Sequence, residues 1–254
     1  ARDCARLLGA IAGRDGKDAS SSRERVPEYE GGLMRSIVGL RVGVPEGYFD
    51  EDLDADVASL VEESLDVFRS RGASIIRVEM PPVLHRVAEI HPLVMKAEGS
   101  ANHGAWKRSR AHDYSEEVGK RLEAGFFIPA TDYINALQYR GAALREFSDA
   151  VFSKADVLHT PVLPMPTPSL EATAYSDGPA YLEMVVALTR NTKVVNYFGL
   201  PAISVPCGFT PDGMPTSFQL IGRPFAEDVL LRLGHQYQLE TNWHERMPSA
   251  LADM

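Results

Sequence analysis

A strand, a helix and a second strand follow one another in residues 36–82, and this succession restricts the fold more than any other feature of the sequence. The apolar runs SIVGLRVGVP and ASIIRVEMP predict the two strands. Between them lies a stripe of apolar residues at helical spacing: Val57, Leu60, Val61, Leu65 and Phe68. Asp54 or Asp56 can cap this helix, and Gly72 can end it. Because a single helix joins the strands, they are expected to run parallel with a right-handed crossover, which predicts an α/β fold.

The sequence on either side extends this unit to one domain of four parts. Residues 1–35 predict a helix and a polar linker. Residues 83–154 predict a helical segment with breaks near Gly104 and Gly125. Residues 155–254 predict strands that close the sheet, followed by a final amphipathic helix.

The last part carries the strands expected to complete the sheet. ADVLHTPVLPMPTP predicts a short buried strand at 157–160 that runs into a loop, because proline suits neither a helix interior nor a central strand. PAISVPCGF and PTSFQLIGRP predict two more strands, joined by a turn at Asp212 and Gly213. Ser204 and Cys207 are expected to be small residues that face the core. These strands predict a mixed central β-sheet covered by helices.

Charge and motif content exclude several classes of function. The formal net charge is -9, and the densest basic stretch, WKRSR at 106–110, is short and followed by acids. Nucleic acid and anionic membranes need clustered lysine and arginine, so neither is expected as a partner. The seven histidines and two cysteines lack metal-ligand spacing, and no GxSxG, GxGxxG, Walker or HExxH motif occurs. We therefore expect no metal and no cofactor. Cys4 and Cys207 are expected to be reduced, buried thiols in a cytoplasmic protein.

Three groups of reactive side chains have simpler structural interpretations. The serines at 20–22 lie among Asp, Arg and Glu without a glycine-flanked turn, which favours a surface loop. Ser153 and Lys154 are neighbours that point in different directions on a helix, which argues against a catalytic pair. His159 ends a buried strand, where sites often lie in α/β sheets, but a hydrogen-bonded core histidine is the simpler interpretation. These residues by themselves give no catalytic assignment.

Five stretches, in order along the chain, resemble the amidase signature family. CARLLGAIAGRDGKDASSS is similar to the helix and linker that follow its signature region, and GLRVGVPEGYF resembles the next strand. EGSANHGAWKRSRAHDYSEEVGKRLEAGFFIPATDYINALQYR resembles its helical segment, and ADVLHTPVLPMPTP its strand and proline loop. The run from NYFGLPAISVPCG to TNWHERMP is similar to the end of the family's enzymes. The resemblance spans nearly the whole chain and implies the amidase signature fold.

The resemblance implies an enzyme that hydrolyses or transfers amides with a nucleophilic serine, a second serine in a cis peptide, and a lysine. There, a neutral lysine accepts a proton through the bridging serine, and backbone N–H groups stabilise the oxyanion. The family's Gly/Ser-rich signature is absent here, where the one Gly-Gly pair, Gly31-Gly32, precedes Leu33 and Met34. No catalytic residue is therefore assigned to this chain. Residues 1–254 are expected to be the C-terminal portion of a single amidase domain, supplying scaffold and substrate pocket.

The resemblance also points to five candidate substrate-binding residues. In the family's glutamine-using tRNA amidotransferase subunits, an arginine and an acid hold the glutamine zwitterion, and the arginine matches Arg121. The acid position falls on Thr189, which argues against glutamine as the substrate. Asn191, Thr192 and Asn196 are further polar residues that enter the following strand. They either orient a substrate amide or cap local backbone.

The leading hypothesis is a hydrolase of a small-molecule amide, more similar to the generic amidases than to the amidotransferase subunit because of the ending TNWHERMP. Two alternatives remain open: a noncatalytic binding or structural paralogue or subunit, and a glutamine-dependent tRNA amidotransferase subunit. As part of a larger sheet, the chain would expose an edge strand and an apolar face. The expected partners are the N-terminal half of the same enzyme or a second chain, with a homodimer as a further option.

Overall fold

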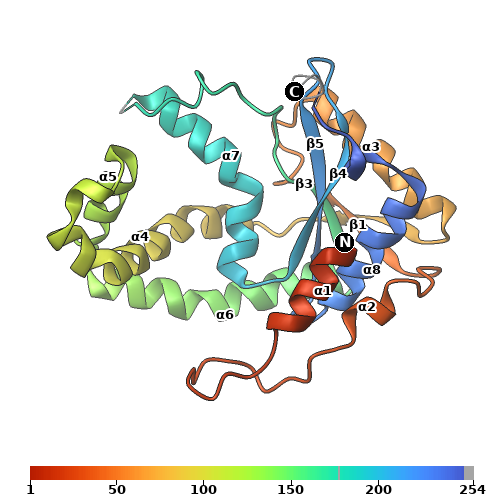
Figure 1. Ribbon diagram of the computed structural model, residues 1–254, viewed down its shortest axis with the longest axis horizontal. Coiled ribbons are helices and arrows are strands. Elements are labelled where there is room, and N and C mark those ends of the chain that lie inside the picture. The colour runs from red at the N-terminus through yellow and green to blue at the C-terminus, as the bar shows by residue number, and fades with distance from the viewer. Residues whose placement is uncertain (177, 249–254) are drawn as a thin grey trace.

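The computed structural model describes residues 1–176 and 178–248, which form one mixed sheet between two layers of helices (Figure 1). The strands are β1 (Arg41–Glu46), β2 (Ser74–Glu79), β3 (Val157–Pro161), β4 (Ala202–Phe209) and β5 (Pro215–Gly222). They pair in the order β2-β1-β3-β5-β4. β1 runs parallel to β2 and β3, whereas β5 is antiparallel to β3 and β4. The α/β class and the mixed sheet predicted from the sequence are confirmed.

Helices cover both faces of this sheet. They are α1 (Arg2–Ile11), α2 (Tyr29–Gly32), α3 (Ala55–Ser70), α4 (Val83–Ser109), α5 (Glu116–Gly125), α6 (Ala130–Phe152), α7 (Pro179–Phe198) and α8 (Glu227–Glu240), with 3₁₀ turns at Ala111–Asp113 and Trp243–Glu245. α3 and α8 pack on one face, and α4, α6 and α7 share a core with the other. α1 and α2 lie against α8, while α4, α5 and the first half of α7 extend away from the sheet (Figure 1).

The predicted strand–helix–strand unit is present as β1, α3 and β2. Its two strands pair in parallel from Arg41 with Ser74 to Glu46 with Glu79. The apolar stripe of α3 contributes Val61, Leu65 and Phe68 to a buried core, because a 3.6-residue period places them on one side of the helix. This unit fixes where the carboxyl end of β1 lies.

Asp54 caps the start of α3. Its side chain accepts hydrogen bonds from the backbone N–H groups of Asp56 (3.0 Å) and Val57 (3.2 Å). We expect Asp54→Ala to lower the free energy of unfolding by about 1 kcal/mol, because these N–H groups have no partner within the helix. Urea denaturation measures this loss. Asp54→Asn, which keeps an acceptor oxygen, should recover most of it, and an equal loss in both variants would contradict the capping role.

One sequence prediction about the helices is wrong. α4 continues through Gly104 to Ser109 without a break. The packing explains why a glycine stands there, since a Cβ on the buried Gly104 would already touch the ring of Phe126 at 3.4 Å. The residues from Thr189 to Asn196 lie in α7, which leads toward β4, continues to Phe198 and ends at Gly199 with a φ of 71°.

The orientation of β4 corrects a further prediction. Ser204 is exposed, whereas Val205 and Cys207 are buried in the core shared with α3 and α8. Successive side chains of a strand point to opposite faces, so Ser204 faces away from the core that holds Val205. Cys207 is a core residue, as expected, whereas Cys4 on α1 is exposed and its expected burial is wrong. Ser204 therefore lies on a face of β4 that remains accessible.

Candidate functional site

The carboxyl ends of β1 and β3 form the edge of the sheet most suited to a functional site. The two strands are parallel neighbours, and the chain leaves β1 for α3 on one face but reaches β3 from α6 on the other. Ligands of α/β sheets bind in the crevice at such a switch point. The loops that follow the two strands are joined there, because the N–H of Asp54 donates to the carbonyl oxygen of Pro164 at 2.9 Å.

One turn of α7 is fixed to this edge by three side-chain hydrogen bonds, which join it to the loop after β1, to β3 and to β5. The hydroxyl of Tyr48, just beyond β1, donates to the Arg190 carbonyl at 3.0 Å. The Asn191 side-chain amide donates to the Pro161 carbonyl, at the end of β3, at 3.1 Å. The Gln219 side-chain amide on β5 donates to the Asn191 carbonyl at 3.1 Å. Because all three donors are buried, these bonds hold α7 in place where water cannot substitute for them.

Tyr48 has a backbone conformation that is rare for a bulky residue. Its φ is 54°, in the left-handed region, and its N–H donates to the Glu51 carboxylate at 2.9 Å. Burial raises the pKa of its hydroxyl, so the group stays a neutral donor toward Arg190. Arg190 in turn donates to the carbonyl oxygen of Glu51. The strain at Tyr48 is thus held by contacts on both sides, as is typical of functional loops.

A small cavity opens beside this edge under the proline-rich loop. It has a volume of about 190 Å³, and its walls include Met165 and Thr167 of the loop with Ser204 and Ser217 of β4 and β5. No histidine or lysine lines it. The serines therefore lack a base that would turn either of them into a nucleophile. The cavity by itself therefore offers space beside the edge but no activated group.

The sequence-predicted site residues are not brought together. Asn191 is fully buried at the sheet edge. Thr189 and Thr192 lie on the same stretch of α7, and their hydroxyls donate to the carbonyls of Val185 (2.8 Å) and Thr189 (3.2 Å). Arg121 is on α5, in an ion pair with Glu117 at 2.6 Å. Both threonine hydroxyls retain acceptor capacity, whereas the Asn191 amide is committed to the protein.

Asn196 lies further along α7, in a groove between α4 and α6 of about 360 Å³. His91 lines the same groove. Burial and the charge of Lys193 lower the pKa of that imidazole. The ring is therefore neutral near pH 7, and it provides an uncharged hydrogen-bonding group beside Asn196.

Ser64 and His159 form the one serine–histidine hydrogen bond within the described residues, at 2.8 Å. The Ser64 hydroxyl donates to the Val61 carbonyl at 2.7 Å, so His159 Nε2 carries the proton shared with Ser64. Rings of Phe218 (4.6 Å) and Phe68 (6.0 Å) enclose the imidazole, and burial lowers its pKa to about 3. This is a core contact out of reach of any substrate, as the sequence interpretation of His159 expected.

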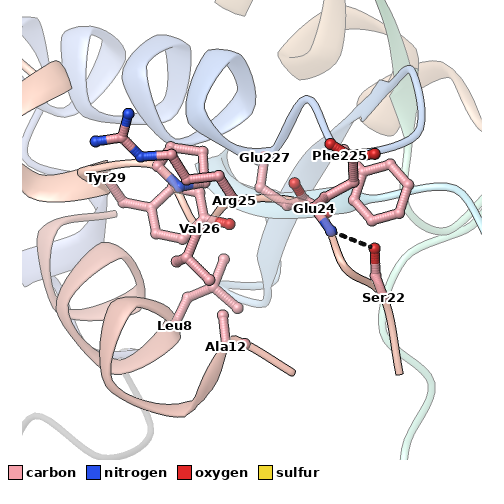
Figure 2. Close-up of a pocket in the computed structure, with 11 residues that line it drawn as sticks. Leu8, Ala12, Ser22, Glu24, Arg25, Val26, Tyr29, Phe225 and Glu227 are labelled. Carbon is pink, nitrogen blue, oxygen red and sulfur yellow. Dashed lines mark hydrogen bonds between the residues drawn. The ribbon is translucent and has the colours of Figure 1, made fainter. Parts of the chain in front are cut away.

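A second hollow of about 270 Å³ lies between the 12–28 segment and the start of α8 (Figure 2). Leu8, Val26 and Tyr29 form its apolar wall. Its other side includes Phe225, which has a φ of 62°. The Ser22 hydroxyl accepts a hydrogen bond from the N–H of Glu24 at 3.0 Å, so this serine stabilises the local turn. No histidine or lysine lines this hollow, and it offers no activated nucleophile.

Residues 1–176 and 178–248 contain no group of three or more His, Cys, Asp or Glu side chains arranged to hold a metal ion. In the same part of the chain, no helix combines the length and the apolar content that a bilayer crossing requires.

Sequence reasoning missed Tyr48 and Gln219. Tyr48 follows the strand in a Gly-Tyr-Phe run that reads as a simple turn. Gln219 is the one strongly polar residue in the run FQLIG, and a polar side chain in an otherwise apolar strand must find a buried partner. That signal identifies Gln219 as bonded, although it does not reveal that the partner is on α7.

Comparisons with known proteins agree with this architecture. The family model described as Amidase matches residues 1–231. A Glutamyl-tRNA(Gln) amidotransferase subunit of Pseudomonas fluorescens (strain Pf0-1) is 34% identical over 272 residues, covering 98% of this chain and 55% of that protein. An Amidase of Pseudomonas putida is 36% identical over 251 residues, covering 98% of this chain and 53% of that protein. The chain thus spans about half the length of the curated relatives it matches.

A solved structure shows the same fold. 6-Aminohexanoate cyclic dimer hydrolase superimposes with a TM-score of 0.81 at 20% sequence identity, covering 98% of this chain and 55% of that chain. The two curated relatives, one an amidase and one from an amidotransferase, are almost equally similar. Overall identity therefore does not separate the two activities. With a family model matching residues 1–231, this chain belongs to the amidase signature family.

Proposed function

We propose that this chain is the scaffold- and pocket-forming portion of an amide-bond hydrolase whose serine, cis-serine and lysine lie in a further portion of the protein. The main support is the family match over residues 1–231. A second support is that loops and α7 enclose the carboxyl ends of β1 and β3. The described residues place no base beside an accessible serine at that edge, which supports a catalytic set supplied from elsewhere. Residues 1–254 would then form part of a single amidase domain.

Within this proposal, α7 carries the substrate contacts. Thr189 and Thr192 present hydroxyls beside the anchored turn and would orient the substrate amide. Arg121 and Asn196 are proposed contacts toward the two ends of the helix, since Glu117 next to Arg121 bonds Tyr181 in the first turn. Asn191 serves the site by holding α7. The free thiols of Cys4 and Cys207 support placing the protein in the reducing cytoplasm.

A glutamine-dependent tRNA amidotransferase subunit is the second candidate, supported by the 34% identical amidotransferase protein of Pseudomonas fluorescens. Thr189 argues against it, because a hydroxyl does not balance the charge of a glutamine ammonium group as a carboxylate does. Glutaminase activity in the presence of partner subunits would favour this candidate. A noncatalytic binding paralogue is the third, and it predicts amide binding without turnover.

The unpaired edge of β4 supports the proposal that another polypeptide segment packs against it, whether the protein is a hydrolase or an amidotransferase subunit. In the described part of the chain β4 pairs with β5 alone, so its other edge leaves backbone donors and acceptors unpaired. A mainly apolar groove of about 420 Å³ runs beside it, between β4 and α1. Leu7 and Ile11 on α1 are 63% and 71% exposed. We propose that the remaining portion of the enzyme, or a second chain, covers this edge.

Samples that contain only the 254-residue chain are expected to self-associate, because the β4 edge and the apolar groove are open together. Light scattering coupled to size exclusion measures this. Adding the partner portion should replace the associated species with a defined complex. A single sharp monomer peak from the chain alone would contradict the proposed covering of β4.

The chain alone is expected to show no hydrolysis of simple amides, whereas the chain joined to the missing portion should hydrolyse them. Release of ammonia or amine from a panel of small amides measures the activity. Serine-reactive inhibitors should abolish it, because the proposed nucleophile is a serine. The proposal fails if the chain alone hydrolyses amides in a reaction that resists such inhibitors.

A further inference from the structure

The middle of α7 accepts side-chain hydrogen bonds that the helix does not need for its own stability. Two successive carbonyls of this helix, at Arg190 and Asn191, accept hydrogen bonds from the side chains of Tyr48 and Gln219. Carbonyls in a helix interior already accept a backbone N–H four residues on, so these contacts are additional. They join α7 to the loop that follows β1 and to β5, and they place the helix relative to the sheet.

Gln219 is the least replaceable of these contacts. It is 3% exposed at the centre of β5, a rigid strand paired on both sides by β3 and β4. Its amide nitrogen lies 3.1 Å from the Asn191 carbonyl, and a carbonyl can only accept, so the NH₂ group must face α7. The Asn191 side chain then donates to Pro161 on the adjacent strand β3. Gln219, Asn191 and Pro161 thus form a continuous connection from β5 through α7 to β3.

The residues proposed to bind substrate lie on both sides of the turn of α7 that these hydrogen bonds hold. Thr189 and Thr192 flank the Arg190–Asn191 pair, so a small shift of this turn moves both hydroxyls. In the N-terminal half of α7, Tyr181 is buried, but Leu182 and Val186 are 58% and 54% exposed. Beyond the threonines, Val194 and Val195 pack in the core. The position of the threonines therefore depends on the C-terminal half of α7, where the buried connection adds to the core packing.

We propose that Gln219 is a positioning residue that sets the placement of α7, and with it the substrate contacts of Thr189 and Thr192, through the Asn191 carbonyl. The effect on substrate binding rests on the proposed amide hydrolysis, whereas the placement of α7 by Gln219 does not. Misplacing binding groups by about an ångström can cost up to a hundredfold in rate. A lost side-chain contact to a buried carbonyl at this turn is enough to permit such a shift.

A matched pair of variants tests the proposal. Gln219→Met keeps the length of the side chain and removes the donor. Gln236→Met does the same to another buried glutamine, which donates to the Leu33 carbonyl at 2.8 Å from α8. Both should lose similar thermal stability, since each leaves one buried carbonyl without its side-chain donor. In the complete enzyme, Gln219→Met should lower kcat/KM about tenfold or more, mainly through KM, while Gln236→Met leaves both constants near those of the parent.

Hydrogen exchange gives a readout that needs no activity. In Gln219→Met, amide protons of α7 should exchange faster while those of α8 are unchanged, and Gln236→Met should show the reverse. If the complete enzyme has no amidase activity, the hydrolase proposal fails, and hydrogen exchange still decides the placement of α7. Equal exchange in α7 for both variants, or equal losses of kcat/KM, would overturn the positioning role.

Discussion

Replacing Gly125 with alanine is expected to lower the free energy of unfolding by about 3 kcal/mol, at the upper end of the cost of overpacking. Gly125 is buried at the end of α5, where α5 crosses α4. A Cβ there would overlap with the carbonyl oxygen of Lys96 and with the Ser100 hydroxyl. The carbonyl is part of the α4 backbone and cannot rotate away. Relief therefore requires α5 to move off α4, and urea denaturation should register the loss.

Gly141→Ala provides the matched control. Gly141 also lies within a helix, α6, but nothing stands within 4 Å of where its Cβ would be. Alanine there should stabilise the protein by about 0.5–1 kcal/mol, because it restricts the unfolded chain and favours the helix. Opposite signs for the two substitutions are the expected result. Stabilisation by Gly125→Ala would show that α4 and α5 are not in close contact.

The glycines show which parts of the fold can be predicted from sequence. Hydrophobic periodicity located the strands and most helices, since burial on one side leaves its mark on local spacing. It did not distinguish Gly104, which lies inside α4, from Gly125, which ends α5. The difference depends on what packs against each glycine from a distant part of the sequence, Phe126 for one and Lys96 for the other. Such contacts have no local signature.

The candidate site shows the same limit. The sequence singled out Asn191 as a polar residue beside a strand, and the structure places its amide on the Pro161 carbonyl, 30 residues away. It singled out Thr189 as a polar residue near the site, and the structure places its hydroxyl on the Val185 carbonyl within α7. The partners Tyr48 and Gln219 come from distant parts of the chain, the loop after β1 and the strand β5. The order and pairing of the strands decide which polar groups face a substrate and which bond to each other. Sequence composition does not reveal that order.

Acidification is expected to destabilise the protein through His159. Burial lowers the pKa of this imidazole to about 3 in the folded state, whereas an unfolded histidine titrates near 6.5. The unfolded chain therefore binds a proton that the folded core excludes, and stability is lost as the pH falls below about 6.5. The loss approaches about 1.4 kcal/mol per pH unit, or about 2.5 kcal/mol between pH 7.5 and 4.5. Urea denaturation at several pH values in that range measures it.

His159→Leu should remove this share of the acid sensitivity. The Ser64 hydroxyl still donates to the Val61 carbonyl in that variant, so the core keeps its remaining hydrogen bond. Burial also lowers the pKa values of His91 and His235, so these two histidines still contribute to the loss of stability in acid. If His159→Leu showed the same loss between pH 7.5 and 4.5 as the parent, the histidine would have to be accessible to protons in the folded state, which its enclosure between Phe68 and Phe218 forbids.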